Sequence, residues 1–177
     1  MKTVIIGGVA AGMSAASKLK RLLGDAVEIV VYEKGGEVSF GACGIPFYIS
    51  DHIKQGKELI ARTAEEFAKS GIPVKIYHEV TAVDTDARTV TVKNLQTGEV
   101  FDDTYDKLVI GSGAGVRHFP PFDRSYTNLF EIRDVADGTR VKQALLDENQ
   151  RHVVIVGAGF IGLELSEACR HYGKEVT

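Results

Sequence analysis

The chain has 177 residues, and it contains no tryptophan, only four prolines, two cysteines and no apolar run long enough to span a membrane. Cys43 and Cys169 lie too far apart to form a disulfide framework, and no histidines or cysteines show zinc-ligand spacing. The net charge of −3 lacks the basic excess of nucleic-acid-binding proteins. We therefore expect no metal, no nucleic-acid or membrane partner, and a reducing, cytoplasmic setting.

Glycine, in contrast, is abundant, with 19 residues. A short apolar run at 4–6 predicts a buried strand, the amphipathic segment 12–23 predicts a helix, and 28–33 predicts a second strand. Together they form a β-α-β unit with a glycine turn after its first strand. Residues 1–17 also resemble a signal peptide, but the glycines and the charged helix that follows favour the β-α-β interpretation.

The rest of the chain predicts an α/β protein with an antiparallel β-meander. Pro46 suits the first turn of a helix over 46–55, and Thr63 with Glu66 has the form of a capping box that opens a helix to about residue 69. The other predicted helices are 134–149 and 159–172, with a loop over 116–128. Strands are predicted at 74–80, 107–110, 152–156 and 174–177. The three strands of the predicted meander are 81–84, 89–93 and 100–103.

The second glycine-rich segment, residues 157–162, is a complete G-x-G-x-x-G between a predicted strand and a predicted helix. Such glycines give a tight turn, allow the backbone to approach a pyrophosphate, and pack the helix closely on the strand. The N–H groups at the start of the helix favour phosphate. We expect a dinucleotide here, with a structural glycine turn as the alternative. The acidic residue that separates NAD from NADP would lie beyond Thr177.

The first segment, residues 7–12, is a degenerate form of the same motif, because Val9 stands where the second glycine usually lies. Glu33 follows Gly12 by about 20 residues at the end of the next strand, where a ribose ligand belongs. The alternative is a packed turn with Glu33 merely exposed. Two dinucleotide units in one chain suggest a flavin and a nicotinamide, because a flavin accepts a hydride and passes electrons to sulfur.

Between the two glycine segments lies Cys43, directly before a predicted helix N-terminus. That placement favours the reactive thiolate, although a buried, inert cysteine is the alternative. Cys169 lies near no motif and is interpreted as packing.

Seven segments in this order resemble the single-cysteine branch of the flavoprotein disulfide reductases: GGVAAGMSAASKLKR, YEK, SFGACGIPFY, YHEV, YDKLVIGSGA, EIRDVADG and VVIVGAGFIGLELSE. This branch includes coenzyme A-disulfide reductases, NADH oxidases and peroxidases, and persulfide or polysulfide reductases. The resemblance implies a Rossmann-like FAD-binding domain over 1–115 and the start of a Rossmann-like NAD(P)-binding domain over 116–177. Family members are more than twice as long and have a C-terminal dimerisation domain, so the resemblance implies a homodimer.

The resemblance also implies roles for individual residues, with Cys43 as the redox-active nucleophile facing the flavin. FAD contacts are implied for Gly7, Gly8, Ala10, Ala11, Gly12, Glu33, Lys34, Val80, Ser112, Gly113 and Arg133. NAD(P)H contacts are implied for Gly157, Gly159, Phe160, Ile161, Gly162 and Glu164. Coenzyme A contacts are implied for Ser14, Lys18 and Arg21, which share one helix face, and for Ser39. The alternative for that face is a solvated basic surface.

Departures from the family pattern separate its branches. Tyr48 occupies the place of the second cysteine in two-cysteine reductases, so the partner thiol must come from the substrate. Ala10 stands where the peroxidase and many oxidases have histidine, and Val116 departs from the proline usual after the SGA segment. The sequence therefore favours reduction of coenzyme A disulfide, with an NADH oxidase or peroxidase or a persulfide reductase as alternatives. A fragment that binds a nucleotide without catalysis is an alternative of another class, and we expect these residues alone to be inactive.

Overall fold

The computed structural model describes residues 1–116 and 125–177, which form two compact units. The first unit contains Met1–Phe40 and Ile60–Ala114, and the second contains Gly41–Leu59 and Gly115–Thr177. Most of the predicted loop over 116–128 lies outside the described residues. Each unit is described by itself below.

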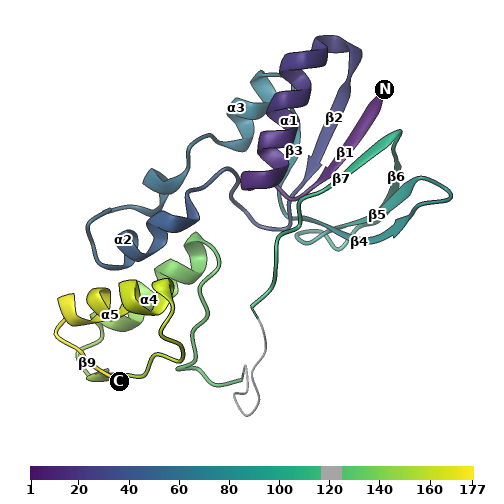
Figure 1. The fold of residues 1–177 in the computed structure, drawn as a ribbon. Coiled ribbons are helices and arrows are strands. Elements are labelled where there is room, and N and C mark those ends of the chain that lie inside the picture. The colour runs from purple at the N-terminus through teal and green to yellow at the C-terminus, as the bar shows by residue number, and fades with distance from the viewer. Residues whose placement is uncertain (117–124) are drawn as a thin grey trace. The chain divides into compact units, whose positions relative to one another are not determined.

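The first unit is built on a parallel sheet of four strands in the order β3-β2-β1-β7 (Figure 1). The strands are β1 (Lys2–Ile6), β2 (Glu28–Tyr32), β3 (Val74–Lys75) and β7 (Lys107–Ile110). The central strand β1 pairs with β2 and β7 in register, so that Ile5 lies opposite Val31 and Val109. This arrangement confirms the α/β interpretation of the sequence.

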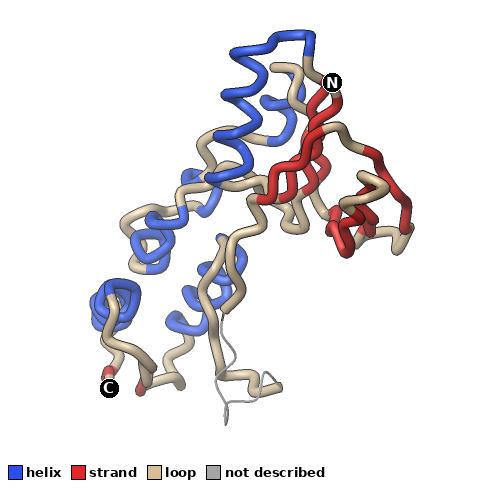
Figure 2. The backbone as a smooth tube through the Cα atoms, turned by 45° about the vertical axis from the view of Figure 1, so that its right-hand side comes forward, coloured by secondary structure: helices blue, strands red, loops and turns tan. Residues whose placement is uncertain are grey.

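Helices cover one face of this sheet, and a second sheet covers the other (Figure 2). The helices are α1 (Ala10–Leu23), followed by a 3-10 turn at Gly24–Ala26, and α3 (Ala64–Lys69). The second sheet is the predicted meander of β4 (His78–Asp84), β5 (Thr89–Asn94) and β6 (Val100–Thr104), all antiparallel.

Side chains alternate between the two faces of the central strands, and this alternation makes two cores. Ile5 packs with Met13 and Ala16 of α1, whereas its neighbour Val4 packs with Val90 and Val92 of the meander. All six side chains are at most 3% exposed. Burial of each large apolar side chain stabilises the fold by roughly 1.5–3 kcal/mol. The first glycine turn is therefore attached to a well-packed unit of three layers.

The second unit consists of short elements around α4 (Val135–Leu146) and α5 (Phe160–His171). Its other elements are 3-10 turns at Ala42–Gly44 and Gly56–Leu59, α2 (Ile45–Ile49), β8 (His152–Val153) and β9 (Glu175–Val176). The strands β8 and β9 are parallel, as a second β-α-β unit requires, and α2 packs on both α4 and α5.

Four predicted elements had the wrong extent. The strand predicted at 74–80 divides into β3 and β4, because Tyr77 adopts a left-handed conformation with φ of 57° as the chain passes between the sheets. The helix predicted at 46–55 ends at Ile49, and Asp51 is left-handed as well, with φ of 65°. The helix predicted to residue 149 ends at Leu146, and the strand predicted over 152–156 ends at Val153.

Within the described residues, no helix is both long and apolar enough to cross a membrane, and no three acidic, histidine or cysteine side chains are grouped as metal ligands.

Candidate functional site

The first glycine turn connects β1 to α1 and has no room for side chains. Gly7 has φ of 100°, in the left-handed region that favours glycine, and its N–H donates to the Tyr32 carbonyl at 2.8 Å. A Cβ atom at Gly12 would lie 1.8 Å from the Gly7 carbonyl oxygen. Only glycine therefore fits at position 12, and the start of α1 lies directly against the end of β1.

A third segment, the end of β7, closes this turn from the other side. A Cβ atom at Gly7 would lie 2.2 Å from the Gly111 carbonyl oxygen, and one at Gly111 would lie 3.0 Å from the Gly12 nitrogen. Gly111 was not among the residues predicted from the sequence. Its position directly after a predicted strand and within a Gly-Ser-Gly run was the signal that could have marked it as a candidate.

Glu33 reaches the same turn from the end of β2. Its Oε2 accepts the Gly8 N–H at 2.6 Å, and its Oε1 accepts the Gly35 N–H at 2.7 Å. A side chain at Gly8 would collide with Glu33 Cβ and Val38 Cγ1, both 2.9 Å away. The structure thus brings Glu33 and the glycine turn together, whereas Lys34 is exposed beside them.

Ser39 also contacts this turn. Its φ of 50° is left-handed, its N–H donates to the Gly8 carbonyl at 2.9 Å, and its carbonyl accepts the Ala61 N–H at 2.9 Å. The conformation is unusual for a residue other than glycine and is held by hydrogen bonds on both sides.

Helix α1 has no side-chain cap and no acidic residue in its first turn. The same holds for α5, which follows the second glycine turn. By contrast, α3 has the predicted capping box of Thr63 and Glu66, and α4 is capped by Asp134, which accepts the Asp137 N–H at 2.8 Å. The two helices that leave glycine turns therefore keep N-terminal N–H groups available to an anion, with Ala10 and Ala11 exposed on α1.

The second glycine turn repeats the geometry of the first. Gly157 has φ of 115°, and a Cβ atom at Gly162 would lie 2.1 Å from the Gly157 carbonyl oxygen. Gly159 is the N-cap of α5, and a Cβ atom there would meet nothing within 4 Å, so this side of the turn is open. Phe160, Ile161 and Glu164 are exposed around it.

The remaining candidates lie at three places. Val80 and Ser112 line one depression of the first unit, together with the ends of β1 and β7, and Gly113 follows with φ of 67°. Arg133 belongs to the second unit, where its backbone N–H donates to Asp137 Oδ2 at 2.9 Å. The cofactor roles expected for these residues stay predictions.

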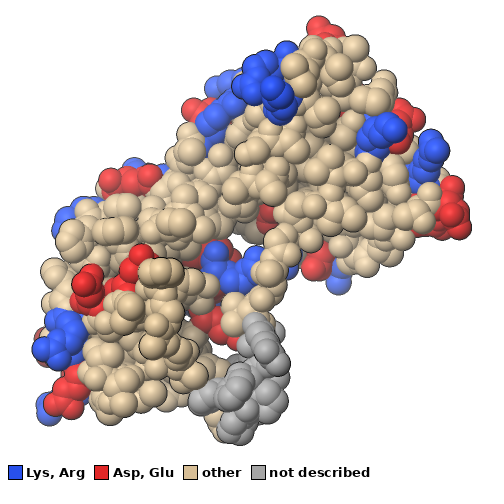
Figure 3. Space-filling model, in the orientation of Figure 1, with Lys and Arg blue, Asp and Glu red and all other residues tan. Residues whose placement is uncertain are grey.

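The helix face predicted to hold a phosphate-rich ligand is exposed. Ser14, Lys18 and Arg21 are all exposed on α1, and basic side chains gather over this part of the first unit (Figure 3). Lys20, on the same helix, is instead paired with Asp25 at 2.9 Å. The three candidate side chains therefore lie where an anionic ligand can reach them.

Cys43 is exposed in the 3-10 turn that runs into α2, whereas Cys169 is buried in α5. Burial raises the pKa of the Cys169 thiol, and the nearby Lys174 cation offsets part of that effect. The turn around Cys43 packs through Gly44, where a Cβ atom would lie 2.5 Å from Leu59 Cδ2. Of the two thiols, Cys43 is the one that a disulfide can approach.

Two glycine turns leave helix N-termini open, as in dinucleotide-binding proteins, and an exposed cysteine lies between them in sequence. Comparison with known proteins agrees: the family model "Pyridine nucleotide-disulphide oxidoreductase" matches residues 1–177, and the chain belongs to this family. Members of the family are enzymes that use FAD and NAD(P)H.

Three relatives illustrate the similarity. The coenzyme A disulfide reductase of Staphylococcus haemolyticus is 37% identical over 177 residues, which are 99% of this chain and 39% of that protein. The structure of reduced Bacillus anthracis CoADR-RHD has a TM-score of 0.92 at 34% identity, covering 99% of this chain and 32% of that one. The NADH-bound water-forming NADH oxidase of Lactobacillus brevis has a TM-score of 0.91 at 30% identity, covering 99% and 38%. The chain thus spans about 40% of the length of the curated relative.

Proposed function

We propose that the protein is a FAD-dependent NAD(P)H oxidoreductase that reduces coenzyme A disulfide through Cys43. The observation that carries the proposal is the contrast between the two thiols: Cys43 is exposed and Cys169 is buried. Tyr48 occupies the place of a second active cysteine, so the disulfide partner of Cys43 comes from the substrate. The similarity to a coenzyme A disulfide reductase supports this substrate.

The residues around the first turn fit an adenine dinucleotide. The turn is closed to any Cβ at Gly7, Gly8 and Gly12, so a pyrophosphate can meet bare backbone at the open start of α1. The Glu33 carboxylate lies at the same turn and suits ribose hydroxyls. Lys34, Val80, Ser112, Gly113 and Arg133 are the further FAD contacts of the proposal. FAD, when bound, supplies the route by which electrons of NAD(P)H reach the disulfide.

The second turn fits a nicotinamide dinucleotide in the same way. Gly157 and Gly162 form the tight turn, Gly159 gives the pyrophosphate an open approach, and Phe160, Ile161 and Glu164 surround it. Ser14, Lys18, Arg21 and Ser39 hold the phosphate-rich coenzyme A, because cations and hydroxyls bind phosphate oxygens with charge-assisted hydrogen bonds. The protein acts as a homodimer in the cytoplasm.

Cys43 acts as the nucleophile. Its thiolate attacks one sulfur of coenzyme A disulfide, the S–S bond breaks, and one coenzyme A thiolate leaves and takes a proton. The product is a mixed disulfide between Cys43 and the second coenzyme A. Two electrons and a proton, both derived from NAD(P)H and solvent, then cleave the mixed disulfide to the Cys43 thiolate and a second coenzyme A thiol.

The first of these reaction steps is tested on the chain itself by measuring its intact mass under non-reducing conditions. Incubation with coenzyme A disulfide should add one coenzyme A to the chain, and Cys43→Ser should abolish the addition. The matched control Cys169→Ser should leave it unchanged. Coenzyme A on Cys169 alone, or no adduct with folded protein, would contradict the proposal.

The second candidate function is an oxidase, which the similarity to the Lactobacillus brevis NADH oxidase favours. In an oxidase, Cys43 would pass through a sulfenic acid. The same mass experiment separates the two, because peroxide treatment would then give an oxygen adduct on Cys43 that forms faster than the coenzyme A adduct.

A further inference from the structure

The helix that follows Cys43 is too short to hold its own position. α2 contains only the five residues Ile45–Ile49, and isolated helices of that length are not stable in water. The exposed cysteine precedes it in a single 3-10 turn. The placement of the thiol therefore depends on what α2 packs against in the same unit, which is α4 and, to a smaller extent, α5.

The two helices approach each other closely at Gly138 of α4. A Cβ atom there would lie 2.8 Å from Ile45 Cγ2 and 3.5 Å from Tyr48 Cδ1. Ile45 is 2% exposed and Tyr48 is 8% exposed, so the contact is dry. A small residue on α4 thus seats the first turn of α2, two residues after Cys43.

Two side chains of α4 then hold Tyr48. The Tyr48 hydroxyl lies 3.1 Å from Thr139 Oγ1, which itself donates to the Val135 carbonyl at 2.9 Å. The Lys142 ammonium lies 4.5 Å from the centre of the Tyr48 ring, a distance typical of a cation–π contact. Tyr48 is therefore held at its hydroxyl and over its ring face.

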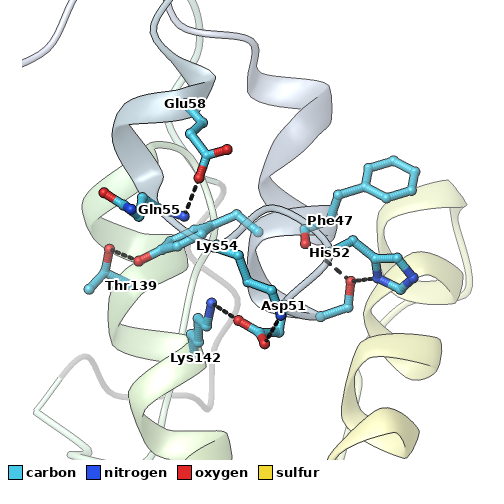
Figure 4. Close-up of polar contacts among 10 residues, drawn as sticks. Phe47, Asp51, His52, Lys54, Gln55, Glu58, Thr139 and Lys142 are labelled. Carbon is cyan, nitrogen blue, oxygen red and sulfur yellow. Dashed lines mark hydrogen bonds and ion pairs between the residues drawn. The ribbon is translucent and has the colours of Figure 1, made fainter.

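Lys142 also fixes the end of α2. Its Nζ lies 2.8 Å from Asp51 Oδ1, and Lys54 pairs with the other oxygen of Asp51 (Figure 4). The hydrogen bond from Lys142, followed by that from Lys54, lowers the pKa of Asp51 to about 2. The Lys142 side chain is only 13% exposed, and Asp51 is the left-handed residue at which the chain leaves α2. One cation thus ties Tyr48 and Asp51 to α4.

We propose that Thr139 and Lys142 of α4, acting through Tyr48 and Asp51, are positioning residues that hold the Cys43 turn in its reactive placement. The inference rests on the proposed role of Cys43 as the redox thiol. Tyr48, at the place of a second cysteine, is in this proposal the residue of α2 through which α4 positions the Cys43 thiol.

The test is amide hydrogen exchange of the whole chain, read by peptide over 41–51 and over α5. Lys142→Met keeps the apolar stem and removes the cation, and we expect exchange over 41–51 to become about tenfold faster while α5 changes less than about twofold. Lys142→Arg should restore slow exchange. Arg140→Met is the matched control, because Arg140 pairs with Asp137 on the same helix outside the cluster.

A second pair of variants tests the hydroxyl contact. Tyr48→Phe and Thr139→Val each break the same hydrogen bond, so the double variant should accelerate exchange over 41–51 no more than either single variant does. Unchanged exchange over 41–51 in Lys142→Met would overturn the proposal, because Lys142 would then not order this segment. An equal acceleration in α5 would also overturn it, because it would show only a general loss of stability.

The reaction of Cys43 with coenzyme A disulfide is measured on the same variants. We expect Lys142→Met to slow formation of the adduct about tenfold, with rescue by Lys142→Arg. If the unaltered chain forms no adduct, the proposed function fails, while the exchange data still decide whether α4 orders the cysteine turn. If exchange over 41–51 becomes faster while coenzyme A disulfide reacts with Cys43 at an unchanged rate, the positioning role is overturned.

Discussion

The Glu33 carboxylate and the Gly8 N–H lie 2.6 Å apart, which ties the end of β2 to the turn that follows β1. The second carboxylate oxygen accepts the Gly35 N–H at 2.7 Å, so both oxygens are oriented before any ligand arrives. An acceptor fixed in this way suits the paired hydroxyls of a ribose, because little side-chain freedom is lost when they bind.

Glu33→Gln tests this acceptor. The amide replaces one acceptor oxygen by a donor and removes the charge, so we expect the dissociation constant of FAD to rise about tenfold. Isothermal titration of the chain with FAD measures the change. Glu28→Gln, at the exposed start of the same strand, serves as control. An equal effect of both substitutions would show that the charge alone matters.

The two glycines of the second turn should respond differently to alanine. Gly162→Ala places a Cβ 2.1 Å from a backbone oxygen, and we expect a loss of roughly 1–3 kcal/mol in the free energy of unfolding. Gly159→Ala has open space and an ordinary φ of −76°, so the chain should stay as stable while NADH binding weakens at least tenfold. Chemical denaturation and NADH fluorescence measure the two effects. A stable Gly162→Ala chain would contradict the tight turn.

The two cysteines should differ in their reaction with iodoacetamide. Cys43 is exposed, whereas Cys169 is 3% exposed and burial raises its pKa. Because the thiolate is the reacting form, we expect Cys43 to be alkylated on the order of a hundredfold faster at about pH 7.5. Peptide mapping over time measures both rates. Comparable rates in folded protein would mean that α5 opens readily.

Acid should weaken the link between the two sheets of the first unit. Burial alone would raise the pKa of Asp103, but hydrogen bonds from Lys2 and Tyr32 outweigh it and hold that pKa below the ordinary value of 3.8. A lowered folded pKa contributes stability that is complete above the unfolded value and is lost as the pH falls through the folded value.

Asp103→Asn should remove this acid dependence below about pH 4 and lower the free energy of unfolding at pH 7 by roughly 1–3 kcal/mol. Urea denaturation at several pH values measures it. Asp102→Asn, on the other side of the same strand, is the control and should leave the loss of stability at acid pH unchanged. If stability is still lost at acid pH in Asp103→Asn, other carboxylates are responsible for that loss.

Local patterns predicted much of the fold. The strand at 107–110, the meander and the capping box at Thr63 are confirmed, because the residue patterns that indicate them are local in the sequence. The strand at 107–110 is not buried as predicted, since Lys107 and Ile110 are exposed. The division at Tyr77 and the end of α2 at Ile49 were missed, since both depend on left-handed residues that carry no glycine signal.

The candidate site shows the same limit. The spacing of Gly12 and Glu33 predicted that Glu33 lies at the first turn, because a β-α-β unit places consecutive strand ends side by side. The close packing of Gly111 on Gly7 and the contacts of Lys142 with Tyr48 could not be predicted. They join segments about 100 residues apart in sequence, and only the folded chain brings them together.

The pairing of β1 with β7 has a consequence for synthesis in the cell. Thr3 lies opposite Lys107 in the sheet, so during synthesis β1 waits for a neighbour made about 100 residues later. At ~5–20 residues per second this delay is roughly 5–20 s. During that interval β1 has β2 on one side and an unpaired edge on the other. The nascent chain is then most exposed to wrong pairing and to chaperones.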